Sequence, residues 1–246
     1  MSKYLNVFNT LAEYQAFSAS TEYVQPNVAL VKETNVLYYD YGDNKPQADM
    51  SDYKVESQET SVGGDNYGNS AITKINYIPN GITSLIDAFK FFYSLEEVTC
   101  KIPDSVIHMK STFYGCRSLV NAPDIPSGVI NMESTFYECR SLVNAPNIPS
   151  GVTNMNFTFY GCTNLVNAPV IPSSVTSIFY TFKNCTSLKE VTFLHTTPIT
   201  YSNTLQGCSK LENIYVPDES VDAYKTATGW SEFASKFKPL SSKPTK

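Results

Sequence analysis

A segment of 23 residues repeats through most of the chain. Phe113 to Pro126 reads FYGCRSLVNAPDIP, and Phe136 to Pro149, 23 residues later, reads FYECRSLVNAPNIP. The cysteines Cys116, Cys139, Cys162, Cys185 and Cys208 share this spacing. A fixed period of this size predicts a solenoid, in which each unit buries its apolar face only by stacking on its neighbours.

Composition narrows the classes of function. Of the 246 residues, 42% are hydrophobic and 17% charged, and the net charge is -5. These values allow a packed core and argue against a nucleic-acid partner, which needs clustered Lys and Arg. The start, MSKYLN, has no apolar signal segment, and no stretch is long and apolar enough to cross a membrane. We therefore expect neither Sec-dependent export nor membrane insertion.

Apolar positions three or four residues apart define the predicted coil. Phe136, Cys139 and Leu142 predict a helical or 3₁₀ turn, and Leu142 to Ile148 predicts a short extended piece whose prolines limit its length. Strands of successive coils should pair in parallel. The predicted core ladder consists of the five repeat cysteines and Phe113, Phe136, Phe159 and Phe182.

The first coil departs from the period. One extra residue near Cys100 breaks the register, and Phe92 stands where later coils carry Cys. This replacement supports an apolar role for the cysteines, since Phe has no thiol chemistry. Stacked cysteines point in the same direction, whereas a disulfide needs converging Cβ vectors, so we expect free thiols. Zinc needs four ligands around a point, and a line of cysteines does not supply them.

Outside the repeats, the chain divides into four further parts. Residues 1–45 form a small module, with a predicted helix from Thr10 to Phe17 and a hairpin of VALV (28–31) and VLYY (36–39). Such a module is too small to bury much surface alone, so we expect it to dock on a partner or a copy of itself. Residues 46–70 have the composition of a polar linker or of an arm that orders only on a partner, and a linker is favoured. The solenoid spans 71–217, residues 218–240 form a helical cap in which Trp230 plugs the open end, and 241–246 form a tail.

The repeat resembles the BspA-like (treponemal-type) leucine-rich repeat. The residues that carry the resemblance are Ile125-Pro126, Val129, Met132, Phe136, Cys139 and Leu142, and the ending around Tyr215-Val216-Pro217 and Gly229-Trp230 is also similar. The repeat of this chain differs from the family pattern at Ala122-Pro123, where many members carry a larger aliphatic residue in the strand. The resemblance implies an α/β solenoid, a right-handed leucine-rich-repeat stack, used for adhesion or recognition and often on bacterial surfaces.

The N-terminal residues resemble a different group of proteins. Tyr4 to Phe8, Pro26 to Val31 and Val36 to Tyr39 are similar to the opening of structural proteins from crAss-like phages of gut bacteria. That similarity implies a place in the virion, assembled in the host cytoplasm and released by lysis, which would put a recognition solenoid outside the cell without an export signal.

Two rows of side chains are candidate binding residues. The first row, Tyr114, Tyr137 and Tyr160, follows the core Phe in each coil and should face outward. A covering role over neighbouring coils is favoured over binding for these tyrosines. The second row, Asn121, Asn144 and Asn167, lies on the extended piece. These amides would either bind a glycan or peptide or form a stabilising amide ladder, and the sequence does not decide between the two.

Nothing in the sequence supports catalysis. His108 and His195 stand alone, and no carboxylate pair recurs, so we expect no enzyme activity and no cofactor. The first hypothesis is a virion fibre or decoration protein, homo-oligomeric or anchored to virion proteins through residues 1–45, whose solenoid binds a host-surface glycan or protein. The alternatives are a bacterial cell-surface adhesin and an intracellular protein-binding scaffold.

Overall fold

The computed structural model describes the strands β1 (Leu5–Phe8), β2 (Val28–Val31) and β3 (Val36–Tyr39), residues 73–75, Ile78 and residues 82–244. β2 pairs with β3 in the antiparallel arrangement expected for a hairpin, and β1, which was not predicted, pairs with β2 in parallel. The predicted helix from Thr10 to Phe17 and the predicted linker, residues 46–70, lie outside the described residues.

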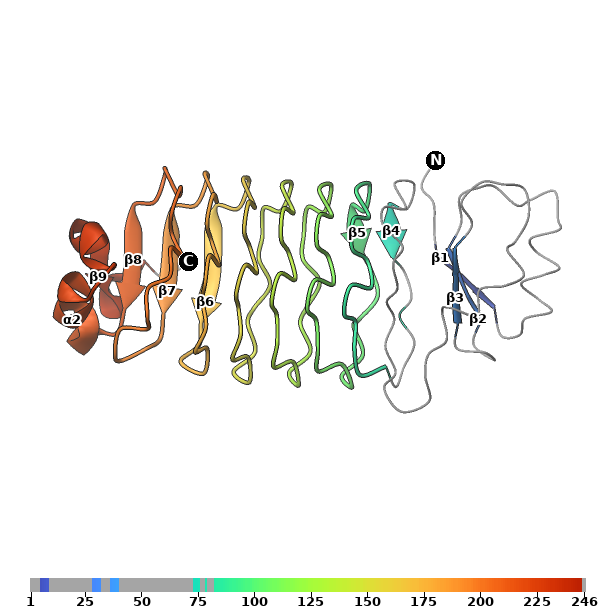
Figure 1. The fold of residues 1–246 in the computed structure, drawn as a ribbon, viewed down its shortest axis with the longest axis horizontal. Helices are drawn as coiled ribbons and strands as arrows, with labels where there is room; N and C mark the ends of the chain where they lie inside the picture. The colour runs from blue at the N-terminus through green and yellow to red at the C-terminus, as the bar shows by residue number, and fades with distance from the viewer. Residues whose placement is uncertain are drawn as a thin grey trace.

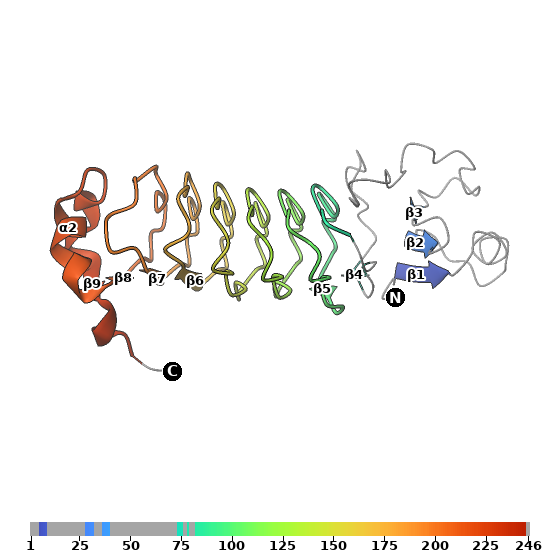
Figure 2. The same cartoon turned by 90° about the horizontal axis from the view of Figure 1, so that it is seen from below.

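From residue 82 to β8 (Asn213–Val216) the chain is a stack of similar coils (Figure 1). The strands β4 (Lys74–Ile75), β5 (Glu97–Val98), β6 (Asn167–Ile171), β7 (Glu190–Phe193), β8 (Asn213–Val216) and β9 (Phe237–Pro239) line one side of it (Figure 2). β6 to β9 form one sheet in chain order, and every pair in it is parallel. The predicted parallel pairing of successive coils is therefore confirmed.

Prolines limit the sheet in the middle coils. There, the ladder is reduced to the isolated bridges Asn121↔Asn144 and Asn144↔Asn167. The pairs Ala122-Pro123 and Ala145-Pro146 follow these asparagines, and proline has no amide hydrogen to donate to the ladder. In β7, Val191 and Thr192 replace the Ala-Pro pair, and Val191 pairs directly with Ile214 of β8.

Stacked phenylalanines fill the interior. Phe113, Phe136, Phe159 and Phe182 are fully buried, and their ring centroids lie 5.5 Å apart from coil to coil. Phe89 extends the stack at 5.6 Å from Phe113, a step of 24 residues that matches the extra residue predicted near Cys100. The extra residue therefore lies between Phe89 and Phe113 and leaves the stacked core residues aligned.

The cysteines lie beside this stack as free thiols. Cys116, Cys139, Cys162 and Cys185 are fully buried, and Cys208 is partly exposed. Each Sγ donates a hydrogen bond, 3.0–3.1 Å long, to the carbonyl of the core Phe (Phe89 for Cys116) in the preceding coil. The cysteines therefore join coils through a polar contact as well as by apolar packing.

A buried threonine ladder was not predicted. Thr112, Thr135, Thr158, Thr181 and Thr204 precede the core Phe or Leu and have no exposed surface. In the Thr135 coil, the hydroxyl lies 2.7 Å from the Met109 carbonyl of the preceding coil and 2.8 Å from the Met132 carbonyl of its own. The contacts recur from Thr158 to Met132 and from Thr181 to Met155. A buried hydroxyl needs such partners.

The predicted helical or 3₁₀ turn is wrong. Residues 132–141 form a run of turns in which alternate amides bond within the coil and to the next coil. Thr135 N donates to Met132 O at 3.1 Å, whereas Ser134 N donates to Asn156 O at 2.8 Å. Ser134 and Glu138 have φ values of 55° and 56°, which a right-handed helix does not contain. The spacing of three residues between apolar side chains therefore reflects successive turns and not a helix.

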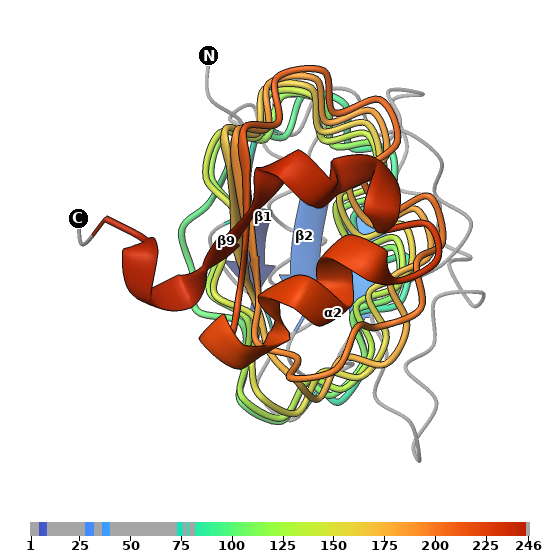
Figure 3. The same ribbon diagram turned by 90° about the vertical axis from the view of Figure 1, so that its left-hand side faces the viewer.

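Helical segments lie across the C-terminal end of the stack (Figure 3). They are η2 (Asp218–Ser220), α2 (Val221–Thr226), η3 (Ser231–Lys236) and η4 (Leu240–Ser242). Trp230 is buried among Phe193, Tyr201, Tyr224 and Phe237, and its indole N–H donates to Ile199 O at 2.6 Å.

The described part of the predicted tail is docked rather than free. Lys243 Nζ lies 2.8 Å from Thr192 Oγ1 and 3.3 Å from Glu190 Oε1, over the ring of Tyr215. These contacts cover the outer face of β7 and β8, which explains why Thr192 and Tyr215 are buried.

Replacing Thr135 with Val tests the threonine ladder. The variant keeps the shape but removes the hydroxyl contacts to Met109 O and Met132 O. We expect the free energy of unfolding to fall by about 1–2 kcal/mol in urea titrations. Thr135→Ser keeps the hydroxyl and should lose less. Equal losses in both variants would show that the hydroxyl contributes nothing.

The thiols predict a pH dependence of stability. Burial raises the pKa of Cys116, Cys139, Cys162 and Cys185 above the ordinary thiol range. In the unfolded chain these thiols ionise near pH 8.5, whereas in the folded chain they stay protonated. Their contribution to stability is therefore fully present below that pH and is lost above it. We expect a loss of about 1.4 kcal/mol per thiol per pH unit above about pH 8.5. Urea titrations between pH 7.5 and 9.5 measure it, and Cys162→Ala should reduce the slope by about a fifth, because burial also raises the pKa of Cys208 to about 12.

Candidate recognition surface

Two residues per coil in the left-handed region shape the surface. The first set has φ between 53° and 56°, and the second set has φ between 56° and 80°. The first set is Ser111, Ser134, Phe157, Tyr180 and Asn203, and the second is Gly115, Glu138, Gly161, Asn184 and Gly207. In the Tyr137 coil these residues flank the segment that directs Thr135 and Phe136 inward. Tyr137, between Phe136 and Glu138, is directed outward.

The tyrosine row forms one continuous stack. The ring centroids of Tyr114 and Tyr137 are 4.3 Å apart and those of Tyr137 and Tyr160 are 4.6 Å apart, with the rings within 5° of parallel. Both faces of the Tyr137 ring are therefore covered by its neighbours, and its edge and hydroxyl are left for solvent or a ligand. This geometry satisfies the covering role predicted for these tyrosines. A binding role stays a prediction and is restricted to hydroxyls and ring edges.

Burial, and then the neighbouring Tyr114, raise the pKa of Tyr137. The hydroxyl of Tyr137 is therefore neutral at physiological pH and can both donate and accept a hydrogen bond.

Further aromatic side chains extend the tyrosine row into an aromatic belt. The belt consists of Phe91, Tyr93, Tyr114, Tyr137, Phe157, Tyr160, Phe179 and Tyr180, which are linked by ring contacts. Tyr93 is 37% exposed and Phe179 is 39% exposed, and the other rings are half-buried. The 23-residue step from Phe157 to Tyr180 was visible in the sequence, but the positive φ that directs both rings to the surface was not.

Basic side chains accompany the belt. Arg117 lies 5.0 Å from the ring centroid of Tyr93, and Lys183 lies 4.3 Å from that of Tyr180. Lys90 lies over Phe91 and Tyr114. These cation–π contacts hold positive charge beside exposed aromatic surface. The belt can therefore offer apolar contact, hydroxyl groups and cations to the same partner.

The asparagine row lies seven residues further along each coil. Asn121 and Asn144 are exposed, and Asn167 is half-buried at the start of β6. Asn144 Nδ2 donates to Asn121 Oδ1 at 3.0 Å, which is the contact of an amide ladder. Val120 and Val143, next to them, are 42% and 39% exposed. The row has a structural contact between two members, and its role in binding stays a prediction.

A scan against known families identifies this architecture. The family described as BspA type leucine rich repeat region (6 copies) matches residues 60–178 and 155–228, which is more than half of the chain. The chain belongs to the BspA-type leucine-rich-repeat family. The predicted resemblance of the repeats is therefore confirmed. The similarity of residues 4–39 to phage structural proteins is not shown by the comparisons and stays a prediction.

Two solved structures of leucine-rich proteins are similar to this chain. One is a leucine rich cell surface protein from Faecalibacterium prausnitzii, which is 25% identical, with a TM-score of 0.47. The match covers 77% of this chain and 47% of that one, so this chain spans about half of that protein's length. Another is a leucine-rich repeat protein from Bacteroides ovatus, 19% identical over 65% of this chain and 64% of that one, with a TM-score of 0.25. No curated protein matches this chain.

The described residues of this BspA-type chain contain no group of three or more His, Cys, Asp or Glu side chains arranged to hold a metal ion. His195 is buried, with Nε2 2.7 Å from Val175 O. His108 lies in a different coil, where its backbone forms an isolated β-bridge with Asn131. In the same part of the chain, no helix has the length and apolar character needed to span a bilayer.

A double-mutant cycle tests the backbone that presents the belt. A Cβ atom at Gly161, where φ is 70°, would lie 3.2 Å from Glu138 Oε1 in the preceding coil. Gly161→Ala should lower the free energy of unfolding by about 1–2 kcal/mol, because an L side chain in this region is strained. In a Glu138→Gly background the same change should cost less, because the Glu138 side chain is gone. Equal costs in urea titrations of both backgrounds would contradict the contact between these coils.

Proposed function

We propose that this chain is a non-enzymatic recognition scaffold that binds a protein or glycan on a cell surface. The observation that carries the proposal is the aromatic belt, which runs from residue 91 to residue 180 across successive coils. Rigid aromatic side chains bind partners at a low entropic cost, and surface aromatics and Arg are enriched in protein interfaces. Family membership supports a repeat scaffold, and solenoids use extended surfaces of this kind for binding.

The scaffold proposed for this task is a right-handed solenoid of 23-residue coils with a C-terminal cap at residues 218–240. The bridges between residues 23 apart support the coil length. The burial of Trp230 against Phe193 and Phe237 supports the cap. A cap protects the last coil, whose apolar interior would otherwise meet water.

Binding to surfaces by the full chain tests this function. A fluorescent protein is applied to gut bacteria and to epithelial cells, and bound fluorescence is measured by flow cytometry. The variant Tyr93→Ser with Phe179→Ser removes the two most exposed belt rings. We expect it to bind at least tenfold more weakly.

Ile130→Ser is the matched control, because Ile130 is 44% exposed and lies outside the belt. It should bind as the unaltered chain does. Equal binding by belt variant and control, or no binding to any surface, would contradict the proposal.

The sequence suggests two biological locations for the scaffold. An adhesin at a bacterial cell surface agrees with the BspA-type family. A virion fibre or decoration protein, anchored through residues 1–45 and homo-oligomeric, is supported by the resemblance of residues 4–39 alone. Antibodies against the chain, applied to fractionated source cells and to purified phage particles, distinguish them. Label on particles that disappears when residues 1–45 are deleted supports the virion, and label confined to the cell envelope supports the adhesin.

A further inference from the structure

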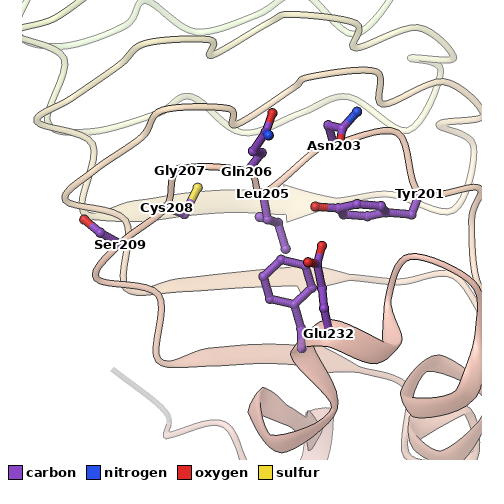
Figure 4. Close-up of a pocket in the computed structure, with 9 residues that line it drawn as sticks. Tyr201, Asn203, Leu205, Gln206, Gly207, Cys208, Ser209 and Glu232 are labelled. Carbon is purple, nitrogen blue, oxygen red and sulfur yellow. The ribbon is translucent and has the colours of Figure 1, made fainter.

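A cavity that is open to solvent lies at the seam between the last coil and the C-terminal helical segment (Figure 4). Its volume is about 310 Å³, at the small end of ligand pockets, and it is lined by Tyr201, Asn203, Leu205, Gln206, Gly207, Cys208, Ser209, Glu232 and Phe233. Residues 201–209 belong to the last coil, and Glu232 and Phe233 belong to η3. The cavity does not involve the aromatic belt.

The cavity follows from departures of the last coil from the repeat. Leu205 stands at the position of the core Phe and is smaller. Asn203 stands where the two preceding coils carry Phe157 and Tyr180, at the same positive φ. Asn203 and Leu205 are smaller than the rings at the equivalent positions of the preceding coils, both line the cavity, and η3 supplies the opposite wall. The ring centroid of Phe233 lies 5.8 Å from that of Tyr201.

The polar groups in the wall are of both hydrogen-bonding kinds. The Tyr201 hydroxyl faces the Glu232 carboxylate (Figure 4), and burial followed by this hydrogen bond raises the pKa of Tyr201. Asn203 and Gln206 carry amide donors and acceptors, and Ser209 carries a hydroxyl. Burial raises the pKa of the Cys208 thiol to about 12, so this thiol is not a nucleophile at neutral pH.

We propose that this seam cavity binds one neutral sugar unit of a glycan. Sugar hydroxyls both donate and accept, as the wall does, and the apolar face of a pyranose can pack against Phe233. An anionic ligand is disfavoured by Glu232, because no Lys or Arg lines the cavity. A cationic ligand would pair with Glu232 but would make no use of the amide and hydroxyl donors of Asn203, Gln206 and Ser209.

The assignment goes beyond the proposed recognition function, because it concerns a site outside the aromatic belt and names the chemical class of its ligand. Saturation-transfer NMR on the full chain tests it. The probes are the methyl glycosides of galactose, glucose, mannose, fucose and N-acetylglucosamine, with arginine amide and inorganic phosphate as charged comparators. We expect millimolar binding of at least one glycoside and none of the comparators.

Asn203→Tyr restores the aromatic residue of the preceding coil, and Tyr180 already occupies this backbone conformation. The variant should fold and reduce glycoside binding at least tenfold. Ser134→Tyr makes the same replacement at the equivalent position of a distant coil and should bind normally. Glu232→Gln keeps a hydrogen-bonding group and should still bind the glycoside, whereas binding of arginine amide would be abolished by it.

Three results would overturn the assignment. They are no saturation of any glycoside, binding of arginine amide or phosphate in place of a glycoside, and glycoside binding that Asn203→Tyr does not reduce. Circular dichroism confirms that each variant is folded. If no glycoside binds but binding to cell surfaces still depends on the belt, only the assignment of the cavity is wrong. If a glycoside binds but binding to cell surfaces does not depend on the belt, only the proposed function is wrong.

Discussion

The structure depends on bonds between the interior of one coil and the backbone of the next. A 23-residue unit has too little apolar surface to fold alone, so its stability must come from its neighbours. Here the buried threonine hydroxyls and cysteine thiols donate to carbonyls of the preceding coil, and the phenylalanines stack at 5.5 Å. These three contacts use residues of one five-residue segment, such as 135–139, so one short motif sets both the register and the packing between coils.

The same contacts determine what the surface can present. Because the coils are held in register, residues one position away from the core also line up, and Tyr114, Tyr137 and Tyr160 form their stack without a separate framework. The surface then changes only where the repeat itself changes, as at Asn203 and Leu205 in the last coil. The regular coils therefore provide an extended surface, and the irregular last coil provides a cavity.

The sequence predicted the interior of the stack well, because a fixed period reports directly on which side chains must align. The spacing of Phe136 and Cys139 placed both in the core, where the structure has them. It misjudged the turn after Met132, because apolar residues three apart arise from a 3₁₀ helix and from successive β-turns alike. The φ of 55° at Ser134, which decides between them, has no signature in a serine.

Contacts that occur once could not be predicted from a repeat. The hydroxyl ladder recurs in every coil from Thr112 to Thr204, yet it was also missed, because threonine is common at protein surfaces. The docking of Lys243 on Thr192, and of η3 on the last coil, depends on how segments far apart in sequence meet in space. The candidate site follows the same division. The tyrosine row was visible as a period, whereas Phe179 and the seam cavity required the three-dimensional structure.

Alkylation of the native chain tests the central claim most directly. The folded protein is treated with iodoacetamide, and modification at each cysteine is followed by mass spectrometry. Cys100, which is partly exposed, should react first, while Cys116, Cys139, Cys162 and Cys185 should stay unmodified until the chain unfolds. Rapid modification of these four in the folded protein, or disulfides between them, would contradict a stack held together from inside.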